Sequence, residues 1–249
     1  MNGLYLFIPI LSGIVGAVIA SWLVQEYDNY GKKYSYFLKK IIRRSECDFC
    51  QKKLNFYELV PILSFVLQKG KSTCCNKILP KKYIVFETLG AVIFLIGALC
   101  SFINISILAL LLIFLIFVDE RYKEIALWNN LSVLIWVLHE VINRLAFNEI
   151  LFNLIGAVSA VLVLLFIYVF YKAIRKREGI GMGDIILLFS TFLYFGIPLS
   201  FYLLTAASLS LILKIVITGK YKNKHAFGSW IAGFFLIFTV FREFYEIAG

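Results

Sequence analysis

Charged residues are scarce in this sequence. They make up 16% of the 249 residues, against roughly 25% in ordinary globular chains. Hydrophobic residues reach 61%, and phenylalanine alone occurs 24 times. A soluble fold of this length cannot bury so much apolar surface, and the same figures exclude a disordered chain, a coiled coil and a small disulfide scaffold. The composition therefore predicts an all-α polytopic membrane protein.

The motifs of several soluble enzyme classes are also missing. The two histidines, His139 and His225, are isolated in the sequence, which argues against a His-based catalytic triad. The glycine-rich run 179–183 has neither a preceding strand nor a following Lys-Ser/Thr pair, as a phosphate-binding loop would have. No G-x-G-x-x-G fingerprint follows a strand, so the residues alone do not indicate a nucleotide cofactor.

Apolar runs predict about eight transmembrane helices, because a helix needs about 20 apolar residues to cross the hydrocarbon core. The first run has no basic start and no small-residue cleavage site, so we expect a membrane helix rather than a removable signal peptide. The polar residues 26–82 form a small segment between the first two helices. The expected spans are 4–24, 83–101, 104–120, 127–147, 150–173, 183–198, 199–218 and 227–246.

The basic residues predict the orientation of these helices. Thirteen Lys and Arg residues lie in 26–82, and the loops that alternation places on the same side bring the total, with Lys214, to 23 of 25. Only Arg144 and Arg242 lie opposite. Cytoplasmic loops are enriched in Lys and Arg, so this side is cytoplasmic and both termini are outside. The net charge of +10 then reflects topology and anionic lipid, and we expect no nucleic-acid partner.

Four of the five cysteines fall in the segment expected to be cytoplasmic. Cys47 and Cys50 have the C-x-x-C spacing that suits two thiolates on one Zn²⁺ ion, and Cys74 and Cys75 would complete a four-cysteine site. The adjacency of the second pair is poorer geometry for two ligands, so unpaired reduced thiols are the alternative. A metal would stabilise a segment that has little core of its own.

Two acidic residues lie at the ends of apolar runs on the predicted cytoplasmic face. Asp119 closes one run and Asp184 opens another, 65 residues later. Two carboxyl groups at matched depth can approach each other and share a proton, as in aspartic proteases. The alternative is that both simply mark the membrane–water interface, with Asp184 as a helix N-cap.

Together these features resemble one known family. Gly181-Met182-Gly183-Asp184 is a Gly-x-Gly-Asp motif that opens an apolar helix, and Asp119 closes an earlier one, as in membrane aspartyl proteases. The polar segment is similar to that of the bacterial type IV prepilin peptidases. The residues that carry this second likeness are Cys47-x-x-Cys50, Glu58-Leu59-Val60-Pro61-Ile62-Leu63-Ser64, Gly70-Lys71, Tyr83, Glu87 and Phe227-Gly228.

The resemblance implies a bifunctional enzyme of the bacterial cytoplasmic membrane. Such enzymes cleave the leader of type IV pilin-like precursors at the cytoplasmic face, and many then methylate the new amino terminus with S-adenosylmethionine. By motif, Asp119 and Asp184 are catalytic, Gly181 and Gly183 support them, and the Cys47–Cys75 region corresponds to the zinc-associated segment. The implied domains are a first helix (1–25), a methylation-associated segment (26–82) and a seven-helix peptidase domain (83–249).

The chain departs from the family pattern at three places. Ser72 stands where the family has the first cysteine of its second pair, so Cys74 is the candidate for the fourth metal ligand. Ala126 replaces a proline after the first aspartate, and Ile186 replaces a common lysine after the second. The departures leave both aspartates intact, but the first of them means that the zinc site does not follow the family's ligand spacing.

Two other functions fit the residues. One is a peptidase without methyltransferase activity, because methylation follows from the resemblance alone. The other is a non-enzymatic membrane assembly or transport protein with a zinc-stabilised loop. The sequence gives neither the S-adenosylmethionine site, nor the oligomeric state, nor the particular pilin.

Overall fold

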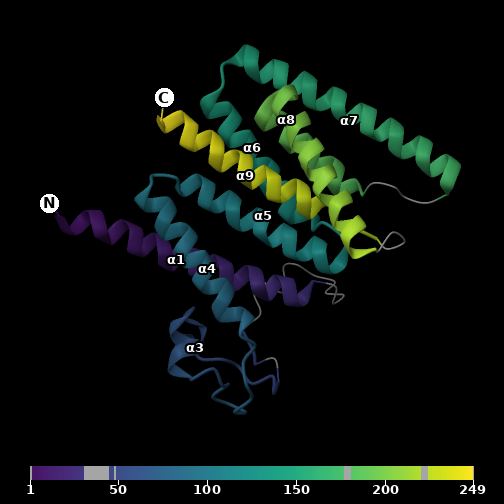
Figure 1. Cartoon of the computed structure of the whole chain (residues 1–249). Helices are drawn as coiled ribbons and strands as arrows, with labels where there is room; N and C mark the ends of the chain where they lie inside the picture. Colours follow the sequence, from purple (N-terminus) through teal and green to yellow (C-terminus); the bar gives the residue numbers. More distant parts are fainter. Residues whose placement is uncertain (1, 31–44, 48, 177–180, 220–223, 249) are drawn as a thin grey trace. The chain divides into compact units, whose positions relative to one another are not determined.

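Helices make up almost all of the regular structure. The computed structural model describes residues 2–30, 45–47, 49–176, 181–219 and 224–248, and Figure 1 shows its helices in chain order. Within these ranges no strand is present, and the extended structure consists of two isolated bridges. The all-α class is thus confirmed. Residues 31–44, inside the expected cytoplasmic segment, and Gly179, which begins the glycine-rich run, lie outside the described residues.

The contacts divide the chain into two compact units, Met1–Leu110 and Leu111–Gly249. Unit 1 contains α1 (Asn2–Asn29), the 3-10 helix η1 (Phe56–Leu59), the short α3 (Leu63–Leu67), α4 (Lys82–Leu99) and the start of α5 (Ile103–Tyr122). Unit 2 contains the rest of α5, α6 (Leu127–Arg144), α7 (Phe147–Arg175), α8 (Met182–Thr218) and α9 (Phe227–Ala248). The expected division by function at residues 25 and 82 stays a prediction.

In unit 1, α1 packs closely along α4. Gly16 of α1 lies directly against the backbone of Gly90 in α4, where a side chain on either residue would collide with the other helix. Small residues of this kind let membrane helices approach, since lipid provides no hydrophobic force between them. Ser12 Oγ adds a hydrogen bond of 3.1 Å to the Phe94 carbonyl oxygen.

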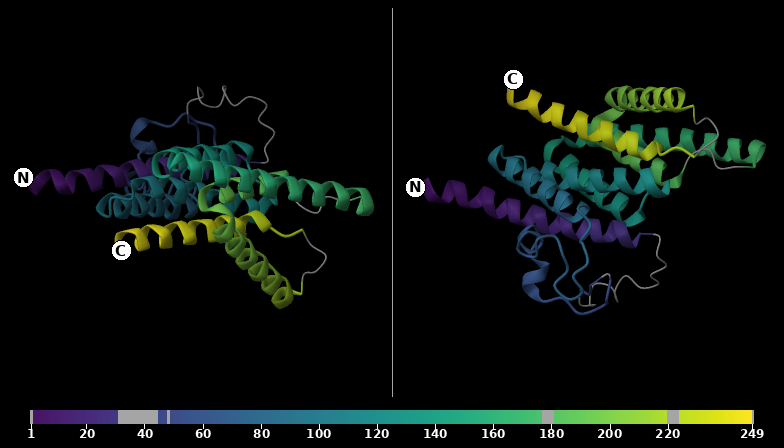
Figure 2. Two further views of the ribbon diagram at one scale, coloured as in Figure 1. Left: turned by 90° about the horizontal axis from the view of Figure 1, so that it is seen from above. Right: turned by 60° about the horizontal axis from the view of Figure 1, so that its bottom comes forward.

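In unit 2, α8 contacts α6, α7 and α9, and its direction changes at Gly196, whose φ is 72°. Figure 2 shows the last part of α8, in yellow-green, diverging from the first part. Side-chain donors satisfy carbonyl groups beside the break: Ser200 Oγ donates to Thr191 O at 3.1 Å and Asn153 Nδ2 to Leu193 O at 3.2 Å. Such partners are needed because a membrane interior offers no water. The break agrees with the expected boundary between the spans 183–198 and 199–218.

Among the described residues, six helices are long and apolar enough to cross a membrane: α1, α4, α5, α7, α8 and α9. The composition of these helices confirms the expected multi-pass membrane protein, while its orientation stays a prediction.

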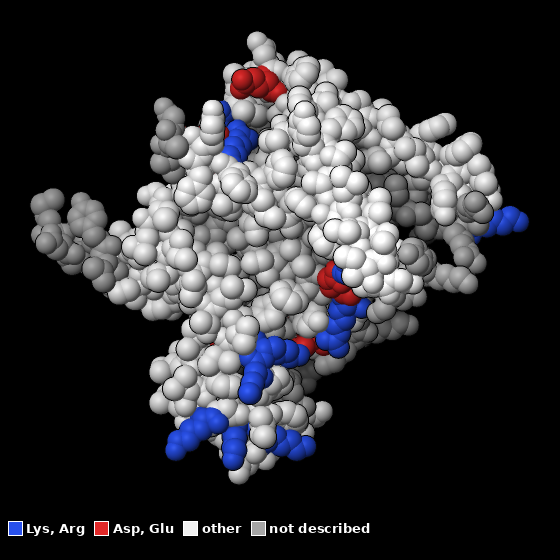
Figure 3. Space-filling view, viewed as in Figure 1, with Lys and Arg blue, Asp and Glu red and all other residues white. Residues whose placement is uncertain are grey.

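Helix α6 is amphipathic and buries Glu140, whose carboxylate pairs with Arg144 at 2.7 Å. Arg144 also pairs with Glu243 of α9. Figure 3 shows Lys and Arg gathered over the cysteine-containing part of unit 1.

Candidate active site and metal centre

Asp119 lies in the last turn of α5, and its side chain is buried, with 4% of the residue exposed. Its Oδ2 atom accepts a hydrogen bond of 2.6 Å from the backbone N–H of Ser229. Ser229 belongs to the first turn of α9, where N–H groups have no partner within the helix. The carboxyl group of Asp119 therefore faces the N-terminus of α9.

Asp184 lies in the first turn of α8, and its Oδ2 accepts a longer hydrogen bond of 3.3 Å from the Gly181 N–H. Its other oxygen, Oδ1, points to α9, where a Cβ atom added to Gly228 would lie only 2.8 Å away. Asp119 and Asp184 thus reach two consecutive residues of α9, Ser229 and Gly228. The fold brings together the two aspartates that the sequence singles out.

Glycines around Asp184 make this approach possible. A Cβ atom on Gly183 would lie 2.8 Å from Cβ of Ile125, and one on Gly228 would lie 2.5 Å from Ile125 Cδ1. Ile125 therefore fills the space between the start of α8 and the start of α9. Gly181 has a φ of −75°, which any residue can adopt. At Gly183 and Gly228, the requirement is for close packing.

Sequence reasoning did not identify two polar partners of this site, Ser229 and Asn130. The Asn130 side chain is fully buried in α6, and its Nδ2 donates a hydrogen bond of 2.8 Å to the Gly183 carbonyl oxygen. The bond ties the glycine motif to α6. The available signal was the pair of successive asparagines, Asn129 and Asn130, because buried polar side chains usually have a specific partner.

A third acidic residue, Glu120, is next to Asp119 but has a different environment. Its Oε1 accepts a hydrogen bond of 2.7 Å from Lys214 Nζ of α8 and one of 3.3 Å from Ser229 Oγ. Lys123 Nζ lies 3.5 Å from the other oxygen. Two lysines therefore balance the charge of Glu120, which distinguishes it from the aspartates.

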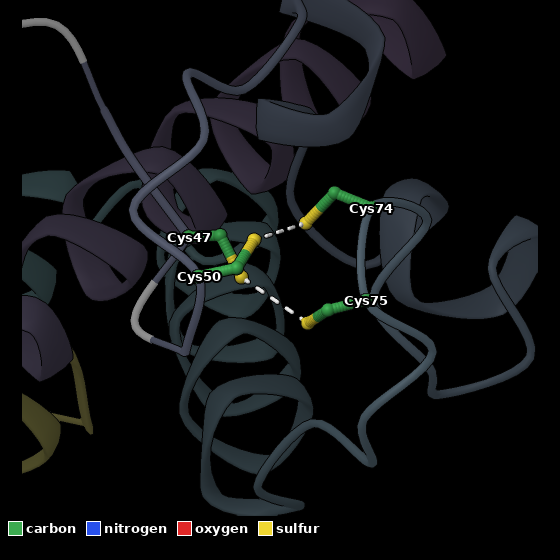
Figure 4. A group of neighbouring side chains, drawn as sticks. All are labelled: Cys47, Cys50, Cys74 and Cys75. Carbon is green, nitrogen blue, oxygen red and sulfur yellow. Dashed lines mark hydrogen bonds between the residues drawn. The ribbon is translucent and has the colours of Figure 1, made fainter.

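The four cysteines of unit 1 form one cluster. Their Sγ atoms all lie within 4.8 Å of one another, and Figure 4 shows Cys47 and Cys50 facing Cys74 and Cys75. The Sγ atoms of Cys50 and Cys74 lie 3.1 Å apart, and those of Cys47 and Cys75 lie 3.8 Å apart. Four thiolates bound to a tetrahedral Zn²⁺ at about 2.3 Å would be about 3.8 Å apart, so the donor set and its spacing fit this ion. Adjacency does not keep Cys74 and Cys75 from the cluster.

Two turns with the same hydrogen bonds carry the cysteines. In the first, the Cys47 N–H donates to Lys52 O and the Gln51 N–H to Cys47 O. In the second, the Ser72 N–H donates to Lys77 O and the Asn76 N–H to Ser72 O, twenty-five residues later. Gln51 and Asn76 both have positive φ, 58° and 56°. Ser72 and Cys75 therefore occupy the places of Cys47 and Cys50, and Cys74 joins the cluster from outside this pattern.

The Ser72 side chain is buried and lies among the thiol groups. Its Oγ lies 3.5 Å from Cys47 Sγ, 3.0 Å from Cys74 Sγ and 3.4 Å from Cys75 Sγ. A hydroxyl group at this position can donate a hydrogen bond to a metal-bound thiolate, as second-layer groups commonly do. The arrangement provides four sulfur donors and one hydroxyl that holds them.

The thiols differ in acidity. Burial raises the pKa of Cys47, but hydrogen bonds from Ser72 and from the backbone of Cys50 and Phe49 outweigh burial and lower this pKa to about 6. The hydrogen bond with Cys74 raises the pKa of Cys50 to about 12. Without a metal the cluster thus keeps protons on part of its sulfur atoms, and a bound metal must release them.

Glu87 connects the cysteine-containing part to the helices of unit 1. The residue is 6% exposed, and its carboxylate accepts hydrogen bonds from Ser21 Oγ of α1 at 2.7 Å and from the Ile62 N–H at 2.6 Å. Ile62 has a φ of 63°, an unfavourable value for a β-branched residue. Glu87 therefore stabilises a strained backbone before α3.

The comparisons with known proteins agree with the motifs. Residues 14–102 match the model of the bacterial peptidase A24 N-terminal domain. The chain is 29% identical over 160 residues to a prepilin leader peptidase/N-methyltransferase of Dickeya chrysanthemi, covering 58% of this chain and 52% of the relative. With the protein of the same name from Dichelobacter nodosus it shares 30% over 156 residues, covering 59% and 53%.

A third relative of that name, from Pectobacterium carotovorum subsp. carotovorum, is 26% identical over 199 residues, or 76% of this chain and 71% of the relative. No solved structure gives a significant match. The chain spans about half the length of the first two relatives. These findings confirm the resemblance to the type IV prepilin peptidases.

Proposed function

We propose that this chain is a membrane aspartic endopeptidase that removes the leader from type IV pilin-like precursors, with Asp119 and Asp184 as its catalytic pair. The observation that carries the proposal is the convergence of both carboxyl groups on Gly228 and Ser229 of α9. They come from helices 65 residues apart in sequence. Acidic side chains that meet within a membrane bundle are functional candidates by default, since their burial is costly.

The pair can perform peptide hydrolysis by general acid–base catalysis. One ionised carboxylate takes a proton from water, whose oxygen then attacks the scissile carbonyl carbon. The protonated partner donates its proton to the carbonyl oxygen as the tetrahedral intermediate forms. When the C–N bond breaks, the leaving amine takes up a proton and the two carboxyl groups return to sharing one. Glu120 is not part of the pair, because Lys214 and Ser229 already hold it.

The charge pattern supports a cytoplasmic active site. In the sequence, 23 of 25 Lys and Arg residues fall on the side where Asp119 closes its predicted span and Asp184 opens another, and positive loops remain in the cytoplasm. We therefore place the protein in the bacterial cytoplasmic membrane with both termini outside.

The cysteine cluster supports a zinc site held by Cys47, Cys50, Cys74 and Cys75. Such an ion would stabilise the cytoplasmic part, whose other elements are short (η1 and α3). By its likeness to proteins named N-methyltransferases, the chain would also methylate the new amino terminus. S-Adenosylmethionine would supply the methyl group: the amine nitrogen bonds to the methyl carbon, the sulfonium S–C bond breaks, and a proton leaves the amine.

Co-expression of a pilin precursor with this chain tests the proposal. We expect the intact mass of the pilin to fall by the leader and to rise by one methyl group with the wild type. Either Asp119→Asn or Asp184→Asn should leave the precursor uncut. Cleavage without the added methyl would indicate a peptidase alone. Uncut precursor with the wild type would favour an assembly or transport protein.

A further inference from the structure

Unit 1 contains a cavity of about 300 Å³ beside the cysteine cluster. Residues of α1, α4, η1 and α3 line it, and Cys47 and Ser72 form part of its wall. The volume is within the range of small-molecule sites, which starts at about 300 Å³. The cavity therefore belongs to the unit whose sequence matches the peptidase A24 N-terminal domain.

The charge of the cavity wall is opposite to that of the surrounding segment. Residues 26–82 carry thirteen Lys and Arg, yet among the described residues that line the cavity none is basic and three are glutamates, Glu46, Glu58 and Glu87. Hydrogen bonds from Thr73 and from the Asn55 N–H lower the pKa of Glu58 and keep its carboxylate ionised. Such a wall favours a ligand with positive charge.

Aromatic side chains form another part of the wall. Trp22 of α1, Phe65 of α3 and Tyr83 of α4 all line the cavity. Aromatic faces bind a planar base by stacking and attract a cationic group through the ring quadrupole. A carboxylate also accepts hydrogen bonds from ribose hydroxyl groups, as acidic residues do in dinucleotide sites. The wall thus offers a partner for each part of a cationic nucleoside.

We propose that this cavity is the binding site for S-adenosylmethionine, with Glu58 and Trp22 as ligand-binding residues. The inference rests on the methyltransferase part of the proposed function. S-Adenosylmethionine combines an adenine base, a ribose and two positive groups, the sulfonium and the ammonium, so it carries net positive charge. The glutamates distinguish it from S-adenosylhomocysteine, which has the same shape but lacks the sulfonium charge.

Direct binding to the full-length protein in nanodiscs tests the proposal, with methyl-labelled S-adenosylmethionine in equilibrium dialysis. Glu58→Gln keeps a side chain that can cap η1 but removes its charge, so affinity for S-adenosylmethionine should fall about tenfold, as for one hydrogen bond to a charged group. Affinity for S-adenosylhomocysteine should change less. The matched control is Glu149→Gln, since Glu149 caps α7 through the Ala146 N–H at 3.0 Å and lies in unit 2. It should bind as the wild type does.

Trp22 provides a second readout that locates the ligand. The ligand should change the tryptophan fluorescence of the wild type, and Trp22→Phe should abolish that change although Trp128, Trp136 and Trp230 remain. Equal affinity of Glu58→Gln and wild type, or a fluorescence change that persists in Trp22→Phe, would overturn the proposal. So would Glu58→Gln raising the KM for precursor cleavage while ligand binding stays the same, because the cavity would then hold the basic leader. The loss of precursor cleavage in the Asp119 and Asp184 variants tests the peptidase separately.

Discussion

The packing of Gly228 predicts that a single methyl group will disable the proposed catalytic pair without unfolding the protein. In Gly228→Ala, the new Cβ atom would lie 2.5 Å from Ile125 Cδ1 and 2.8 Å from Asp184 Oδ1. Carbon atoms in ordinary contact are about 3.5 Å or more apart. The Ile125 methyl group can rotate away. The Asp184 carboxyl group, however, must move by roughly half an ångström or more, which changes its placement relative to Asp119.

The expected effect on catalysis is large. A displacement of about 1 Å in a reacting group can cost about a hundredfold in rate, so we expect cleavage to slow by roughly ten- to a hundredfold. The free energy of unfolding should not fall in parallel, because alanine is favoured over glycine in helices by about 0.5–1 kcal/mol. The assay is the initial rate of precursor cleavage in proteoliposomes, with helical content and unfolding in SDS measured on the same preparations.

Gly233→Ala is the matched control for this substitution. Gly233 lies in the same helix, and among the described residues no atom beyond its own stretch of helix lies within 4 Å of the position its Cβ would take. This variant should cleave at the wild-type rate. If Gly228→Ala also cleaved within twofold of wild type while folded, the close approach of α9 to Asp184 would not hold, and the reasoning would be refuted.

Three further predictions concern the surroundings of the site. Arg144→Leu removes the cation that pairs with the buried Glu140 and Glu243, so SDS unfolding should show a loss of about 3–5 kcal/mol; an unchanged free energy would count against the pairing. Asn130→Ala leaves the Gly183 carbonyl oxygen without its side-chain donor, at a cost of about 1–3 kcal/mol, and should slow cleavage while near-native helicity by circular dichroism persists. Cys47→Ser and Cys74→Ser should each reduce the amount of bound zinc, measured by plasma mass spectrometry, and lower the Tm. Ser72→Ala should retain the ion. Zinc retained in Cys74→Ser would exclude Cys74 as a ligand.

The helices and the aspartate pair could be predicted from the sequence for simple physical reasons. A run of apolar residues long enough to cross a bilayer has almost no alternative to a helix, because every backbone group must find a partner within it. The break in α8, at Gly196, lies close to the boundary that the sequence reading places between the spans 183–198 and 199–218. Asp119 and Asp184 stood out because charged groups at the ends of such runs are rare.

The contacts that arrange the site could not be predicted, because they depend on tertiary packing. The Asp119 carboxylate accepts a hydrogen bond from the backbone N–H of Ser229, 110 residues away. Because every residue except proline has such a donor, the residue type could not identify this partner. The positive φ of Ile62 likewise depends on Glu87. The equivalence of the two cysteine turns did have a signal, since Cys50-Gln51-Lys52 and Cys75-Asn76-Lys77 are similar. In this comparison Ser72 is equivalent to Cys47, and Cys74 is the proposed ligand that has no equivalent in the first turn.

The most direct measurement of the central claim is the cleavage rate of a purified precursor by the reconstituted protein, with three neighbouring acids changed one at a time. Asp119→Asn and Asp184→Asn keep the size of each side chain but remove its ability to exchange a proton, so each should abolish cleavage. Glu120→Gln changes an acid that Lys214 and Ser229 already hold, and it should still cleave. Cleavage that survives in either aspartate variant would contradict the account.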